Sequence, residues 1–163
     1  MSFRLIQANQ YSLIMSAAFH AGQVKSFAAK LSKGVNEMLN SDDATDAWGT
    51  SCAIGADGIT LSISTPFGQA RAIVVIQLID GHISARYVFE KVVSLDSGEP
   101  AFRQVWAVRI TGDGKVTSDD GAEVIYRVHS ISGQERGNGV ITVALSAVYA
   151  IATDQGYYVA DEK

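Results

Sequence analysis

Hydrophobic and polar residues alternate most regularly on the two sides of Asp80-Gly81. The segments 72–79 and 82–93 are rich in β-branched and aromatic side chains, which is typical of β-strands. Asp-Gly is a preferred pair for a two-residue type I′ turn, because both residues of that turn need a positive φ. These features predict a β-hairpin whose register is set by the turn. The expected pairs, from the turn outward, are Ile79–His82, Leu78–Ile83, Gln77–Ser84, Ile76–Ala85, Val75–Arg86, Val74–Tyr87, Ile73–Val88, Ala72–Phe89 and Arg71–Glu90.

One face of this hairpin is wholly apolar, whereas the other mixes polar residues with an excess of apolar ones. In the expected register, Ile73, Val75, Ile79 and Val88 lie on the second face, where a sheet in contact with water is normally polar. We interpret these four residues as a candidate interface, covered by a second subunit, a partner protein or another part of the chain.

A long amphipathic helix is predicted before the strands, from about Ser12 to Leu39. Its apolar residues recur at intervals of three and four, while its lysines lie mostly away from them. The polar run SDDATD after Asn40 is expected to end the helix in a loop. Because such a helix needs an apolar partner, we expect it to lie on the sheet. Its predicted stripe consists of Leu13, Ala17, Val24, Phe27, Ala28, Leu31, Val35, Met38 and Leu39.

Further alternating segments predict more strands of the same sheet. A second hairpin is expected across Asp57-Gly58, with Cys52 opposite Ile63. Residues 102–111 and 123–131 each alternate in the way that half-buried strands do. Short connections between these segments favour antiparallel pairing of each strand with the next.

Two other segments have ambiguous patterns. Residues 112–121, GDGKVTSDDG, form the most polar stretch, which predicts a protruding loop or a short ribbon. Residues 140–152 fit a helix by their spacing and a strand by their β-branched opening. We predict a strand that pairs with 123–131, and a C-terminal helix is the alternative. The chain after this segment is expected to turn at Gly156 and to add a few residues of edge pairing.

Together the elements predict a single α+β domain spanning residues 1–163. Six or seven antiparallel strands in meander order form a curved sheet, and the long N-terminal helix covers one face of it. No internal repeat or low-complexity tract divides the chain.

Composition narrows the class of protein. The formal net charge of −4 argues against a nucleic-acid-binding protein, whose phosphate contacts require a basic surface. No run approaches the ~18 apolar residues of a membrane span, so we expect no membrane partner. A single cysteine, Cys52, excludes an internal disulfide and indicates a reducing compartment. Because Gln7 and Asn9 interrupt the apolar N-terminal patch, we interpret it as no export signal and expect a cytoplasmic protein.

Candidate chemistry is sparse. The sequence lacks GxSxG, HExxH, CxxC and a complete phosphate loop, and its three histidines have no metal-ligand spacing, so we expect no cofactor and no metal. Cationic residues on two expected strands, Arg86, Arg127 and His129, are candidates for holding a carboxylate or phosphate ligand. The candidate lining of an apolar pocket between helix and sheet is Phe27, Leu31, Tyr87, Phe89, Trp106 and Tyr126.

Two functional hypotheses remain. The first is a small non-enzymatic accessory protein of bacterial type, such as an immunity protein, a chaperone or a mobile-element product, which binds a protein partner and forms a homodimer. Acidity, missing catalytic motifs and the apolar outer face of the central hairpin favour it. The alternative is a small-molecule-binding domain or an enzyme, with its ligand in the pocket between helix and sheet.

Overall fold

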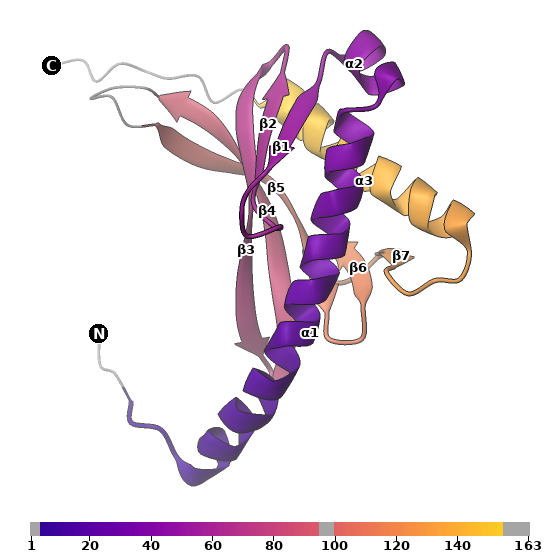
Figure 1. The fold of residues 1–163 in the computed structure, drawn as a ribbon. Coiled ribbons are helices and arrows are strands. Elements are labelled where there is room, and N and C mark those ends of the chain that lie inside the picture. Colours follow the sequence, from indigo (N-terminus) through magenta and orange to yellow (C-terminus); the bar gives the residue numbers. More distant parts are fainter. Residues whose placement is uncertain (1–3, 95–99, 155–163) are drawn as a thin grey trace, which may run out of the picture.

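A seven-stranded antiparallel sheet and three helices make up the computed structural model, which describes residues 4–94 and 100–154 (Figure 1). The strands lie in the sheet in the order β1 to β7, so each pairs with its neighbour in the chain. This confirms the α+β class and the meander. The elements are α1 (Ala8–Leu39), α2 (Asp42–Trp48), β1 (Ser51–Ile54), β2 (Leu61–Thr65), β3 (Gly68–Ile79), β4 (His82–Ser94), β5 (Ala101–Thr111), β6 (Lys115–Ser118), β7 (Val124–Arg127) and α3 (Gly133–Thr153).

The central β3–β4 hairpin has the register expected from its sequence, and every expected pair is present. Asp80 and Gly81 have φ angles of 51° and 79°, as a type I′ turn requires. The β1–β2 hairpin also has its expected register, with Cys52 opposite Ile63. Local turn chemistry is therefore enough to align both hairpins.

A bulge in β5 changes which face its first residues occupy. Phe89 pairs with Trp106, but the next residue, Glu90, pairs with Gln104, so Val105 is an extra residue in the ladder. Strict alternation places Gln104 on the same face as Trp106, and this expectation is wrong. The bulge moves Gln104 to the outer face of the sheet, beside Glu90.

Residues 140–152 belong to the helix α3, so the expected final strand is wrong and its alternative is right. The β-branched opening favours a strand locally, but helical spacing lets the segment bury one continuous row against the sheet, and this tertiary contact decides. Ser132 caps the helix by accepting a hydrogen bond from the amide of Glu135. The buried row is Val143, Ala144, Ala147, Val148 and Ile151.

The polar stretch 112–121 forms a short strand, which agrees with the short ribbon rather than the protruding loop among the two expected alternatives. Within it β6 runs through Val116, which is fully buried opposite Tyr126 of β7. β7 itself is shorter than the expected strand 123–131 and ends at Arg127. The burial of Val116 against Tyr126 thus stabilises a strand although the residues around it are polar.

The polar run after Asn40 forms a short helix, α2, in place of the expected loop. Ser41 caps this helix by accepting a hydrogen bond from the amide of Ala44. The side chain of Asn40 donates to the carbonyl of Cys52 and accepts from the N–H of Cys52, each at 2.8 Å. These two bonds attach the end of α1 to the start of the sheet. The expected turn at Gly156 lies outside the described residues.

Both long helices cover the same face of the sheet. α1 packs on β1, β3, β4 and β5, and α3 packs on β3, β5 and β7 and against α1. Gly139 permits the close approach of α3, because a Cβ at this position would lie 2.3 Å from Cγ of Tyr126. The largest fully buried side chains of the resulting core are Tyr87, Phe27, Phe89, Leu31, Leu39, Leu61, Ile63, Ile110, Ile151, Val24, Val35 and Val108.

Candidate functional site

Most of the aromatic residues expected to line a pocket are packed in the core. Tyr87 is fully buried and its hydroxyl lies 2.7 Å from Oγ of Ser32, which itself donates to the carbonyl of Ile59. Because Ser32 uses its own proton in that bond, Tyr87 is the donor to Ser32. Burial raises the pKa of Tyr87 well above its ordinary value. Phe27, Leu31 and Phe89 are buried in the same core.

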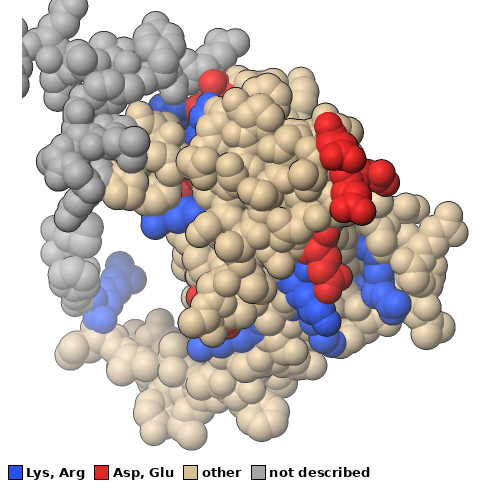
Figure 2. Space-filling model, turned by 45° about the horizontal axis from the view of Figure 1, so that its top comes forward, with Lys and Arg blue, Asp and Glu red and all other residues tan. Residues whose placement is uncertain are grey.

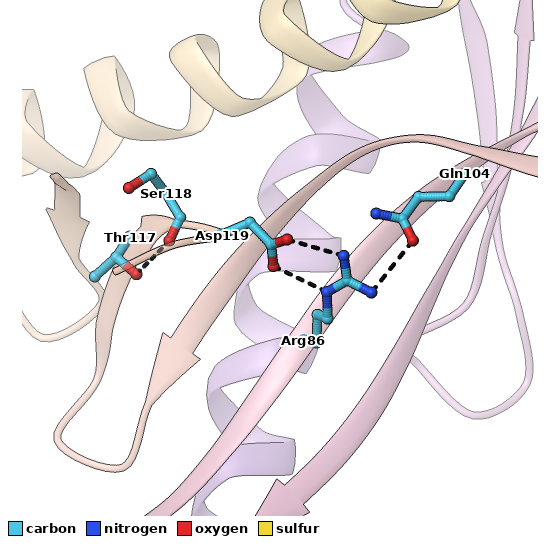
Figure 3. Close-up of polar contacts among 5 residues, drawn as sticks. All are labelled: Arg86, Gln104, Thr117, Ser118 and Asp119. Atoms are coloured by element: carbon cyan, nitrogen blue, oxygen red, sulfur yellow. Dashed lines mark hydrogen bonds and ion pairs between the residues drawn. The ribbon is translucent and has the colours of Figure 1, made fainter. Parts of the chain in front are cut away.

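Arg86 lies on the outer face of the sheet and belongs to a polar network. Its guanidinium donates two hydrogen bonds to Asp119, at 2.8 and 2.9 Å, and a third to Gln104 at 3.2 Å (Figure 3). The bonds to Asp119 cross β5, because Arg86 is in β4 and Asp119 follows β6. This ion pair raises the pKa of Arg86 and lowers that of Asp119. The cation is thus already paired within the chain.

The four candidate interface residues lie on the outer face, as their register requires, but they differ in exposure. Val88 is only 5% exposed, Ile73 and Ile79 are half-buried, and Val75 is 41% exposed. Arg71 lies on the same face and contacts other side chains there. Arg71 bonds to Glu90 at 3.2 Å, and its guanidinium lies 3.5 Å from the ring centroid of Phe102.

The remaining candidate ligand residues lie apart from Arg86. Arg127 is exposed at the end of β7. His129 is also exposed and makes an edge-to-face contact with Phe27, with centroids 4.8 Å apart. Trp106 packs beside Phe89 in the core and borders a surface hollow next to α3, whereas Tyr126 borders a different groove, between α1 and α3. The expected single pocket is therefore divided among separate places.

The largest exposed apolar surface lies on the first half of α1, which projects beyond the sheet (Figure 1). The buried row of α1 begins at Val24, and the helix before it has no buried residue. We call the four side chains that face away from the core on this half the α1 patch. They are Tyr11 (61% exposed), Ile14 (51%), Met15 (59%) and Phe19 (84%), and Leu5 (91%) and Ile6 (59%) precede them.

Sequence reasoning missed this patch, although the sequence holds a signal for it. Residues 5–24 include no Asp, Glu, Lys or Arg. In addition, apolar residues of this half fall on the core side of the helix at Leu13 and Ala17 and on the opposite side at Met15 and Phe19. A helix half that is apolar on two opposite sides and carries no charge normally buries both of those sides. A search for a single apolar stripe along the helix finds only the residues that pack on the core.

The described residues give no support for a metal centre or for a nucleophilic cysteine. No group of three or more His, Cys, Asp or Glu side chains that could hold a metal ion occurs among them. Cys52 is half-buried, and burial raises the pKa of its thiol to about 11, which disfavours the nucleophilic thiolate at neutral pH.

None of the described helices is long and apolar enough to cross a bilayer.

Comparison with known proteins identifies no relatives: no family model, no curated protein and no solved structure matches this chain. The function must therefore be inferred from the geometry, in which the α1 patch is the feature that internal packing does not explain.

Proposed function

We propose that this chain is a non-enzymatic accessory protein that acts through protein–protein contact and forms a homodimer through the α1 patch. The observation that carries the proposal is the exposure of Tyr11, Ile14, Met15 and Phe19 on a helix that projects beyond its own sheet. Contiguous apolar surfaces of this kind mark interaction sites. The immunity, chaperone and mobile-element types expected from the sequence all act by such contacts.

A second copy of the chain is the occupant that the charge pattern favours. The patch lies in a charge-free run, residues 5–24, so two copies face each other without like-charge repulsion. A strongly charged partner would find no complementary charge there. Helices that lie on membrane surfaces usually carry Lys and Arg on their polar face, and this run has none.

Residue spacing also favours a helix as the partner. Tyr11, Met15, Ala18 and Gly22 follow one another at intervals of four, three and four, as in the seam between two packed helices. Small residues at two of these positions allow the two helix backbones to approach closely. In a twofold dimer each α1 would pack on its copy, with Phe19 at the side of the seam.

The area of the patch fits a modest interface. Large side chains of these types bury about 150–250 Å² each, so the exposed parts of the four would contribute about 500 Å² per copy and about 1,000 Å² per dimer. That total lies below the roughly 1,200 Å² at which standard specific interfaces begin, in the range of weak or transient complexes. We therefore expect a dissociation constant in the micromolar range.

Sedimentation velocity between about 1 and 100 µM tests the proposal, with Met15→Glu as the variant. Met and Glu have similar helix propensities, so α1 remains helical while each subunit places a carboxylate in the seam. We expect a reversible dimer for the wild type and at least about 100-fold weaker association for the variant.

Ser16→Glu is the matched control, because it adds the same charge to the neighbouring exposed residue, which lies beside Phe19 but about 100° from Met15 around the helix and outside the seam. We expect this variant to dimerise like the wild type. A wild type that is monomeric at every concentration, or a Met15→Glu variant that dimerises as strongly as the wild type, would refute the proposal.

The proposal retains a cytoplasmic location, on the argument that a lone cysteine such as Cys52 stays reduced there. In the same proposal Val75 has a secondary role in binding. Val75 is the most exposed of the four outer-face candidates and would be a contact for a further protein partner.

A further inference from the structure

A groove lies between the second half of α1 and the first half of α3, with β7 beside it. Its volume is about 820 Å³, within the range of small-molecule sites. The apolar residues along it come from all three elements and include Met38 of α1, Val128 after β7, and Val140 and Ile141 of α3. We call this feature the α1–α3 groove. It is separate from the α1 patch, which lies on the other half of α1.

Glycines keep the groove open. At Gly34 the two helices touch, because a Cβ there would lie 3.0 Å from Cγ2 of Val140. At Gly137, one turn earlier in α3, a Cβ would meet no atom within 4 Å. The helices therefore separate towards the start of α3, and the missing side chain at Gly137 leaves space between them.

Positive charge predominates along the groove. Lys30 and Lys33 of α1 and Arg136 of α3 line it, against one carboxylate, that of Glu37. Within the described residues, neither lysine ammonium has a carboxylate oxygen within 4.0 Å. In the view of Figure 2, blue side chains lie on the surface below the red cluster over α2. A local excess of cations in an acidic protein favours an anionic occupant.

Tyr126 adds a polar group at the inner side of the groove. It is only 4% exposed, and burial raises its pKa to about 12, so its hydroxyl remains protonated at neutral pH. The described residues include no hydrogen-bond partner for this hydroxyl, in contrast to that of Tyr87. Its oxygen is not among the fully buried unpaired atoms of the described residues, so the hydroxyl retains contact with solvent and is open to a hydrogen bond with a ligand.

We propose that the α1–α3 groove binds a small amphipathic organic anion. The apolar body of this ligand lies against Met38, Val140 and Ile141, and its acidic group lies near Lys30, Lys33 and Arg136. This assignment does not depend on dimerisation through the α1 patch.

Fluorescence titration with two matched dyes tests the proposal. The probes are 8-anilinonaphthalene-1-sulfonate and N-phenyl-1-naphthylamine, which share one ring system but differ in the sulfonate. We expect the sulfonate dye to bind with one site per chain and more tightly than the neutral dye. Decanoate, which has the same amphipathic character, should displace it.

Substitutions at Gly137 test the location. Gly137→Leu fills the groove and also improves helix propensity, so the protein should fold while the affinity for the sulfonate dye falls by about tenfold or more. Asn138→Leu is the matched control, since it adds the same side chain at the neighbouring exposed residue of α3, which does not line the groove, and it should bind the dye as the wild type does.

Charge substitutions test the role of the lysines. Lys30→Gln with Lys33→Gln should weaken the sulfonate dye by about tenfold and leave the affinity for the neutral dye unchanged. Lys25→Gln, which removes one lysine charge on α1 outside the groove, should change neither. Equal binding of both dyes to the wild type, unchanged binding to Gly137→Leu, or loss of binding in Met15→Glu would overturn the assignment, the last by placing the dye on the α1 patch.

Discussion

Two glycines in α3, only two residues apart, should respond in opposite ways to the same substitution. In Gly139→Ala the new Cβ would lie 2.3 Å from Cγ, 2.4 Å from Cβ and 2.4 Å from Cδ1 of Tyr126. Ordinary contacts between carbon atoms are about 3.5–4.0 Å, so the overlap exceeds 1 Å. These atoms lie close to the backbone of β7, and a rotamer change of Tyr126 cannot move all of them away. Relief requires α3 to shift away from the sheet.

The magnitude follows from two opposing effects. Replacing a helical glycine by alanine gains about 1 kcal/mol. Overpacking typically costs about 1–3 kcal/mol, and a shift of α3 also loosens the buried row that includes Val143 and Ala147. We expect Gly139→Ala to destabilise the protein by about 2–3 kcal/mol. Gly137→Ala, where the new Cβ meets nothing within 4 Å, should stabilise it by about 0.5–1 kcal/mol.

Urea unfolding monitored by circular dichroism measures both effects. In a parallel thermal unfolding experiment, the apparent melting temperature of a chain of this length should change by about 2–4 °C per kcal/mol. The comparison is internal, because both variants make the same chemical change in the same helix. The reasoning is refuted if Gly139→Ala is as stable as Gly137→Ala.

Two further substitutions test the polar contacts. Ser32→Ala leaves the buried hydroxyl of Tyr87 and the carbonyl of Ile59 without their partner, so urea unfolding should show a loss of about 2–3 kcal/mol. Tyr87→Phe keeps the bond from Ser32 to Ile59 and should lose only about 1 kcal/mol. Equal losses would contradict the assigned hydrogen-bond directions. Asp119→Asn removes an ion pair whose side chains are 32% and 40% exposed, so its cost at pH 7 should stay below about 1 kcal/mol. Because Arg86 lowers the pKa of folded Asp119 below its unfolded value, this stabilisation is present above the unfolded pKa and is lost as the pH falls through the folded pKa. The stability difference between wild type and Asp119→Asn should therefore close between pH 5 and pH 2, and a constant difference would show that the ion pair is not its source.

The sequence pattern was sufficient to predict the register of the hairpins, because this register depends on residues close to the turn. Asp80-Gly81 sets the turn, and the alternation on each side then aligns β3 with β4 along its full length. The pattern failed at α3, where the β-branched residues at its start favour a strand when the segment is considered alone. Only contact with the sheet, including the approach of Gly139 to Tyr126, distinguishes the helix.

The candidate sites were harder to predict from the sequence than the fold was. The outer-face positions of Ile73, Val75, Ile79 and Val88 followed from register, but register alone does not give their exposure, which is 5% at Val88 and 41% at Val75. The α1 patch depends on how far the sheet extends along the helix, a length that the pattern of either element alone does not contain. The groove beside Gly137 depends on the angle between α1 and α3.

The order of the strands has a consequence for how the chain acquires its structure. Since every strand pairs with the next one in sequence, the whole ladder is made of contacts between residues that are close along the chain. Closing such short loops loses little entropy, and chains dominated by near-sequence contacts fold faster than those that need distant strands to meet. The sheet can grow outward from the Asp80-Gly81 turn one hairpin at a time. We therefore expect the docking of α1 and α3 onto the sheet to be slower than the pairing of neighbouring strands.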